Sequence, residues 1–395
     1  MWLDGTQNRR TTTWSIDKAA GSLSISDNST TLTTGDTDSF TIATVGDGAI
    51  TVTSSDTSVA TVSQSGSTVT VTAVAAGHTA ITVSVAEGTN YLAPSDVTYN
   101  LTVQSNISNT LNNNSWQTIS EISQAGDGDL YWDVGDAKQI TLNGQIGDAF
   151  TATNLSLCVF ILHFNYKMNG TAENNIIWSG FKSALTDGAD VVLFDSKVNS
   201  TSTDGTKYFN MNHWGTGNYG GWKGFDLRYD VLGATSTAPS DYGKAHTTSN
   251  VGYDATAETL TNPKTNTLLA ALPADLRNVI KLWSRWIDAT GNKSNTDAGI
   301  KETVDAITLL AEAEVFATRK YANQYEQNHL TQMAYYANGN SAVRYKYNAT
   351  TAGVIWLLAS PIYSAVNNIC TVYGGNIHNS ISVTNPRGLA PAFKT

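Results

Sequence analysis

The sequence predicts two different folded parts, an all-β sandwich near the N-terminus and a larger α+β domain after it. Residues 21–103 alternate apolar residues with Ser or Thr, and this alternation is typical of half-buried strands. An Asn- and Ser-rich stretch follows at 105–115 and predicts a linker. From residue 116 onward, helix-like and strand-like segments are interspersed without a regular βαβ order, which favours an α+β domain over a parallel α/β sheet.

The amino-acid composition argues against several classes of protein. The 395 residues are 41% hydrophobic but only 14% charged, and the formal net charge is -10. A net negative charge argues against a nucleic-acid partner, because phosphates attract basic surfaces. No apolar run approaches the roughly 20 residues that a membrane helix needs, so we expect no membrane insertion. Two cysteines in so long a chain exclude a disulfide framework, and we expect both to be free thiols.

The β-rich part contains "SSDTSVATVSQSGSTVTVTAVAAGHTAITVSV". This phrase resembles the bacterial Ig-like domains found on adhesins and phage fibres. The resemblance implies an Ig-like sandwich over 19–104, in which Val59, Ala60 and Val62 face the core and Ala76–Gly77 makes a turn. Residues 1–18 have the character of a hairpin, and we interpret them as the end of a preceding Ig-like repeat or as a capping hairpin.

Three segments of the second part carry specific structural expectations. The apolar run 155–166 predicts a buried strand, and 265–287 has apolar residues at helical spacing with Pro273 at a helix start. In "NYGGWKGFDLR", paired glycines beside Trp222 predict a tight turn against which the indole packs. We expect Arg228 of that segment to pair with an internal carboxylate.

Few residues suggest catalysis or metal binding. The six histidines form no ligand pair at metal-binding spacing; His163 lies in an apolar strand, and His213 is a weak candidate for a cleft. Cys158 and Cys370 lack a neighbouring base and read as small buried side chains. The spacing of acidic residues in "DGADVVLFDSK" does not match an EF-hand loop; these residues are Asp187, Asp190 and Asp195.

Glu312 and Glu314 are close enough in sequence to form a carboxylate pair for glycoside hydrolysis, but capping or ion pairing is the better explanation. We therefore expect a protein that is not an enzyme and needs no cofactor. A carbohydrate-active enzyme at a fibre tip stays open as an alternative.

Landmarks after residue 115 occur in a specific order: "SWQTISEISQAGDGDLYWDVGDAKQITLNG", "NYGGWKGFDLR", "LLAALPADLRNVIK", "AITLLAEAEVFATR" and "WLLASP…GLAPAF". Together they resemble a prophage domain with a C-type-lectin-like fold, some members of which end in the variable region of a diversity-generating retroelement. The resemblance implies a C-type-lectin-like domain over 116–395 with a variable region at about 362–387. Its invariant skeleton corresponds to Trp356, Ser360, Pro361, Cys370, Val372, Gly388, Ala390, Pro391 and Phe393.

Residue usage gives an independent test of this resemblance. Substituting the adenines of an AAC codon never produces Lys, Glu, Gln, Met or Trp. These five types make up 47 of the 395 residues, so composition alone predicts about three in a 26-residue window. The window 362–387 contains none, as diversification of Asn codons predicts.

The resemblance implies a receptor-binding protein of a phage tail fibre or tip, whose variable C-terminal site binds a protein or glycan on the host surface. Other fibre subunits are then expected as partners, and the virion as the location; a bacterial surface adhesin is the alternative. Tyr, His, Asn and Ser are also frequent in antibody paratopes. The expected ligand-binding positions are Ile362, Tyr363, Ser364, Ala365, Thr371, Tyr373, Asn376, His378, Ser380, Ser382, Thr384, Asn385 and Arg387.

Overall fold

The computed structural model describes residues 16–197, 200–247, 250–337, 341–348 and 353–395, and it divides into two compact units. The first unit extends to Asn106 and the second begins at Ile107. Each unit has its own hydrophobic core. The hairpin that we expect within 1–18 lies almost entirely outside the described residues.

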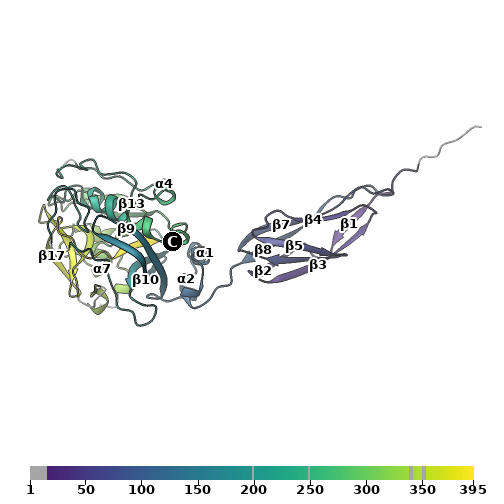
Figure 1. Cartoon of the computed structure of the whole chain (residues 1–395), viewed down its shortest axis with the longest axis horizontal. Coiled ribbons are helices and arrows are strands. Elements are labelled where there is room, and N and C mark those ends of the chain that lie inside the picture. Colours follow the sequence, from purple (N-terminus) through teal and green to yellow (C-terminus); the bar gives the residue numbers. More distant parts are fainter. Residues whose placement is uncertain (1–15, 198–199, 248–249, 338–340, 349–352) are drawn as a thin grey trace, which may run out of the picture. The chain divides into compact units, whose positions relative to one another are not determined.

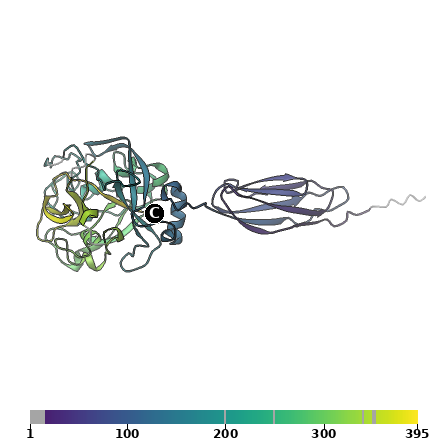
Figure 2. The ribbon, with the colours of Figure 1, turned by 90° about the horizontal axis from the view of Figure 1, so that it is seen from below.

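The first unit is a sandwich of two four-stranded sheets, whose strands run roughly along one direction (Figures 1 and 2). One sheet has the order β1-β3-β6-β5 and the other β2-β8-β7-β4. All neighbours are antiparallel except β2 and β8. The strands are β1 (Ser22–Ile25), β2 (Ser29–Thr33), β3 (Thr37–Val45), β4 (Ile50–Ser54), β5 (Ala60–Ser65), β6 (Thr68–Ala73), β7 (Gly77–Val85) and β8 (Val97–Gln104).

Alternation along the strands builds the core of this sandwich. From Thr79 to Val85 of β7, every second residue is buried while the residues between them are partly exposed, because successive side chains point to opposite faces of a sheet. Phe40 and Tyr99 stack at 4.6 Å between ring centroids in the core. Val59 and Ala60 are buried and Val62 packs against the same cluster, as predicted.

The expected linker is shorter than predicted. Leu111 is buried in the core of the second unit, and the side-chain amide of Asn114 donates to the carbonyl oxygens of Ser108, Thr110 and Leu111. Most of 105–115 therefore belongs to the second unit. Sequence composition misled here because Asn and Ser also close tight turns through their own side chains.

The second unit combines three small sheets with short helices (Figure 1). Its largest sheet has the order β14-β18-β11-β10-β9, and the others are β12-β13 and β15-β16-β17. The strands are β9 (Ala137–Ile146), β10 (Phe150–Phe164), β11 (Ile176–Lys182), β12 (Trp283–Asp288), β13 (Ile300–Asp305), β14 (Thr308–Leu309), β15 (Trp356–Pro361), β16 (Asn368–Tyr373), β17 (Asn376–Ser382) and β18 (Pro391–Lys394).

The helices of this unit are short, and among the described residues only α1 reaches ten residues. Ser115 caps α1 by accepting a hydrogen bond from the Thr118 amide, and Gly126 ends it in the left-handed conformation. The α-helices are α1 (Trp116–Ala125), α2 (Gly128–Tyr131), α3 (Gly221–Gly224), α4 (Ala257–Thr261), α5 (Leu268–Ala271), α6 (Ala274–Arg277), α7 (Glu312–Phe316) and α8 (Ala334–Ala337). Single turns of 3-10 or π type are η1 (Leu111–Asn113), η2 (Arg228–Leu232), η3 (Asp297–Gly299), η4 (Glu326–Asn328) and η5 (Ser341–Arg344).

Two predictions about these elements have different outcomes. The run 155–166 lies almost wholly in β10 and its centre is buried, as expected. The helical prediction for 265–287 is only partly right, because α5 and α6 are separated at Leu272–Pro273 and the segment ends in β12. Pro273 stops the first helix since it has no amide hydrogen to donate, and Trp283–Ile287 then pairs with β13.

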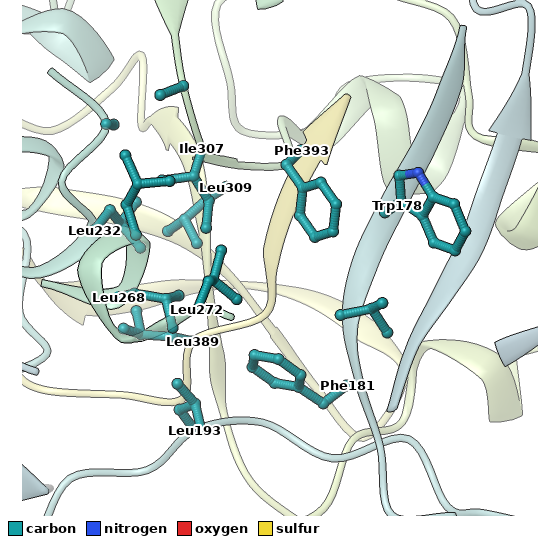
Figure 3. Packing of buried hydrophobic residues seen from close by; sticks show 14 of the residues in the cluster. Trp178, Phe181, Leu193, Leu232, Leu268, Leu272, Ile307, Leu309, Leu389 and Phe393 are labelled. Carbon is teal, nitrogen blue, oxygen red and sulfur yellow. The ribbon is translucent and has the colours of Figure 1, made fainter. Parts of the chain in front are cut away.

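Phe393 is a buried aromatic residue of the largest sheet. It lies on β18, and its ring stacks on Trp178 at 6.2 Å between centroids. Figure 3 shows it beside Trp178 on one side and Ile307 and Leu309 on the other. Trp356, on β15, is equally buried, and its indole nitrogen donates to the Arg344 carbonyl.

We predict that Phe393→Ala or Trp356→Ala lowers the free energy of unfolding of the second unit by about 3–5 kcal/mol, through lost burial and the cavity left behind. Chemical denaturation followed by intrinsic fluorescence measures this loss. Leu130→Ala is the control, since Leu130 is exposed and should change stability by no more than about 0.5 kcal/mol. A loss at Phe393 as small as that at Leu130 would contradict its place in the core.

Candidate functional site

The segment 362–387 is folded, and strands β15 and β18 hold it at both ends. β15 is buried along its whole length, and β16 pairs with β15 on one edge and β17 on the other. Cys370 and Val372 of β16 point into the core beside Trp356. Gly374 and Gly375 make the turn between β16 and β17 with positive φ angles. Figure 1 places β17 at the end of the second unit that lies away from α1.

The exposed part of this segment is a surface around the β16–β17 hairpin, which we call the hairpin face. Tyr373 is 55% exposed, and its ring lies 6.2 Å from that of His378 in an edge-on arrangement. The Nε2 atom of His378 lies 3.2 Å from the Ser380 hydroxyl. Among the predicted positions, the exposed or half-exposed ones are Tyr363, Ser364, Ala365, Tyr373, Asn376, His378, Ser380, Ser382 and Asn385.

Four of the predicted positions are buried, contrary to the expectation that they project outward. They are Ile362, Thr371, Thr384 and Arg387. Thr371 is inaccessible because β16 is the central strand of its sheet and is covered on both faces; its hydroxyl donates to the His378 carbonyl. Alternation of polar and apolar residues therefore fails as a guide to exposure in this strand.

Arg387 is the most consequential of these corrections. Its side chain is only 8% exposed, its guanidinium donates to the Pro386 carbonyl, and its own amide donates to the Phe209 carbonyl. Burial lowers the pKa of this guanidinium. Within the described residues no carboxylate forms an ion pair with Arg387, so it fixes the end of the segment rather than presenting a charge to a ligand.

A neighbouring loop contributes to the hairpin face and was missed in the sequence. The guanidinium of Arg319 lies 4.8 Å from the centre of the Tyr363 ring, in a cation–π contact. The Tyr363 amide donates to the Tyr321 carbonyl at 2.9 Å. No short-range pattern connects 319–321 to 363, because the two segments meet only through tertiary packing.

Glu312 holds this loop in place from beneath. Its buried carboxylate accepts hydrogen bonds from the amides of Lys320, Tyr321 and Ala322. The Cys370 thiol lies 3.7 Å from the same carboxylate. Burial, reinforced by the nearby charge of Glu312, raises the pKa of this thiol well above its ordinary value, so Cys370 remains protonated and unreactive.

Glu314 is also committed to structure. One of its oxygens accepts from the Arg285 guanidinium and the Ala311 amide, both at 2.7 Å, and the other accepts from the Tyr166 hydroxyl. Both Glu312 and Glu314 are fully buried. Capping and ion pairing are therefore what these carboxylates do, and neither is accessible to a polysaccharide in this structure.

The segment 218–228 forms a second buried polar centre. Arg228 makes a buried ion pair with Asp305 at 2.6 Å, as predicted, and the Trp222 indole donates to the other oxygen of Asp305 at 2.8 Å. The Cβ of any side chain at Gly221 would lie 2.1 Å from the Asp288 carbonyl. The glycine is therefore required for the close backbone approach beside Trp222.

Most of the remaining candidates, namely His213, Cys158, Asp190 and Asp195, are buried, whereas Asp187 is exposed. His213 is fully buried rather than lining a cleft, with Nδ1 3.2 Å from Asp230. Cys158 is buried and free, like Cys370. Asp190 contacts Lys346 and Tyr335, whereas Asp195 accepts from the Phe209 amide. Over the described part of the chain, no three His, Cys, Asp or Glu side chains form a metal-binding group, and no helix is long and apolar enough to cross a membrane.

Comparison with known families identifies the first unit. A family described as bacterial Ig-like domain (group 2) matches residues 19–93. The N-terminal sandwich is a bacterial Ig-like domain. A second family, a domain of unknown function (DUF6273), matches residues 245–394 and so includes the whole hairpin face.

We also compared the chain with curated proteins and with solved structures. A search of curated proteins found no match. Among solved structures, domains 5-6 of the S-layer protein SbsC match at 19% identity, covering 47% of this chain and 73% of that chain. Its TM-score is 0.18, and we draw no argument from it.

Glu326 makes the stability of the second unit dependent on pH. It is fully buried, and its oxygens accept from the Asp288 amide and from the Ser360 hydroxyl. Burial, reinforced by the Asp288 carboxylate, raises the pKa of Glu326 from 4.5 to about 8. Burial also raises the pKa of Asp288 to about 6.

We therefore predict that the free energy of unfolding decreases as pH rises from about 5 to 8. The folded state holds a proton that the unfolded state has released, so this stabilisation is complete below pH 4.5 and is lost through about pH 8. One such group gives a slope of about 1.4 kcal/mol per pH unit. Glu326→Gln should flatten the profile in denaturant titrations, whereas Glu258→Gln, on an exposed residue, should not. An unchanged slope in Glu326→Gln would refute the assignment.

Proposed function

We propose that this protein is a receptor-binding component of a phage tail fibre or tip, which binds a host-surface protein or glycan through the hairpin face. In this proposal the second unit is a C-type-lectin-like domain, and a retroelement diversifies its variable region at about 362–387. The observation that carries the proposal is the coincidence of two independent features. The stretch that lacks the five residue types inaccessible from Asn codons also forms a hairpin whose turn and outer strand β17 are largely exposed, while β16 is buried.

The chemistry of the hairpin face suits variable recognition. Tyr373 and His378 offer large amphipathic rings, while Asn376 and Ser380 offer small hydrogen-bonding groups. Their backbone is held by strand pairing and not by the exposed side chains. A side chain can therefore change here without disturbing the core.

The diversification part of the proposal is tested at the level of DNA. We expect an adenine-rich near-copy of the sequence encoding 362–387 close to this gene, beside a gene for a reverse transcriptase. The differences between the two copies should fall at adenines of the template. Sequencing the surrounding locus checks this, and a locus without such a copy would eliminate diversification while leaving receptor binding to be tested by itself.

We predict that Tyr373→Ala and His378→Ala change the free energy of unfolding by no more than about 0.5 kcal/mol. At least one should weaken binding to cells of the susceptible host by about 1–2 kcal/mol, because aromatic residues dominate interface energetics. Tyr253→Ala is the matched control, as Tyr253 is similarly exposed but lies outside the hairpin face. Equal binding by all three variants and the unchanged protein would exclude the hairpin face.

Arg387→Ala should behave differently. We expect it to lower the free energy of unfolding by about 1–3 kcal/mol, because it removes a buried side chain and leaves the Pro386 carbonyl without its donor. Thermal and denaturant melts distinguish the two behaviours. If Arg387→Ala is as stable as Tyr373→Ala, the guanidinium has no structural role.

A bacterial surface adhesin is the second candidate, favoured by the Ig-like domain at 19–93. The hairpin face would then bind a host glycan or protein from the bacterial surface. Immunogold labelling separates the two: labelled tail tips support the phage protein, and labelled cell envelopes without virions support the adhesin.

A further inference from the structure

Within the part of the chain that the structure describes, strand β10 has an edge without a strand partner over half of its length. It spans 15 residues, whereas its neighbour β11 spans only seven and pairs with β10 from Cys158 onward. Among the described residues, the backbone of 150–157 pairs with β9 alone. Alternate amides and carbonyls on the other edge of this half-strand are therefore without a strand partner.

A groove of about 560 Å³ runs along this edge. Its floor includes three successive residues of β10, Leu155, Ser156 and Leu157. Leu155 and Leu157 pack toward the core and Ser156 faces solvent, so a cavity that touches all three lies along the edge of the strand rather than over one face. The apolar segment 191–194 also lines the groove.

The groove carries no formal charge. None of its lining residues is Asp, Glu, Lys, Arg or His. Open strand edges are normally protected by charged residues, proline or strong bulges. The stretch "FTATNLSL" contains no charged residue and no proline, and its one irregularity is the register shift between Ala152 and Leu155.

We infer that this groove binds an extended, uncharged peptide segment of a partner protein, which adds to the largest sheet as a strand beside β10. Strand addition satisfies the free amides and carbonyls, and alternate side chains of the added segment occupy the apolar floor. The absence of charge in the lining selects an uncharged segment, because a charged side chain would be desolvated without a partner. This site is separate from the hairpin face and does not depend on the proposed function.

The test uses the full chain and a yeast-displayed library of random nine-residue peptides. We expect enrichment of peptides with alternating apolar and small polar residues and without charge. Methylating alternate backbone nitrogens of the best peptide should weaken binding at least about tenfold, because it removes the amide donors and keeps every side chain. Equal binding of the methylated peptide, or a library without enrichment, would overturn the proposal.

Variants of the groove complete the test. Leu157→Glu should weaken binding of the same peptide by about tenfold or more, whereas Leu130→Glu, on an exposed leucine outside the groove, should not. If Leu157→Glu fails to fold, Ser156→Glu places a charge in the same groove at an exposed position and should weaken binding of the peptide in the same way. Equal loss in Leu130→Glu refutes the site. So does a dimer that Leu157→Glu converts to a monomer, since a second copy would then occupy the groove.

Discussion

The position of the last strand is the constraint on which the second unit depends. β18 pairs with β14 on one side and β11 on the other, so residues from the end of the chain complete the sheet that β9 and β10 began more than two hundred residues earlier. Phe393 of β18 stacks on Trp178 of the neighbouring strand β11. β18 therefore joins distant parts of the sequence into one sheet and one core.

This closure explains how an irregular, polar segment stays folded. The chain leaves β15, forms the β16–β17 hairpin and returns to β18, so both ends of 362–387 are held by buried strands. The hairpin itself needs only its backbone pairing and a few inward residues, such as Cys370 and Val372. Stability and surface chemistry are thus carried by different residues, as a changeable binding site requires.

Buried carboxylates perform much of the organisation around the hairpin face. Glu312 accepts hydrogen bonds from three successive amides of the 320–322 loop. Glu314 of α7 forms an ion pair with Arg285. Such groups are costly to bury unless they are fully hydrogen-bonded. Their partners lie on different elements, so they fix the relative positions of segments that have little regular secondary structure.

The sequence by itself determined the periodic and locally encoded features. Alternation revealed the sandwich, the apolar run revealed β10, and Arg228 was correctly expected to pair inside the fold, because each depends on spacing or on a single energetic requirement. Only the tertiary structure decided which residues of the polar segments are buried and which distant segments meet. Thr371 and Arg387 looked exposed in a polar stretch yet are buried, and 105–115 looked like a linker yet contributes Leu111 to the core. Burial depends on which distant elements cover a residue. Arg319 meets Tyr363 through tertiary packing, in which the Tyr363 amide donates to the Tyr321 carbonyl.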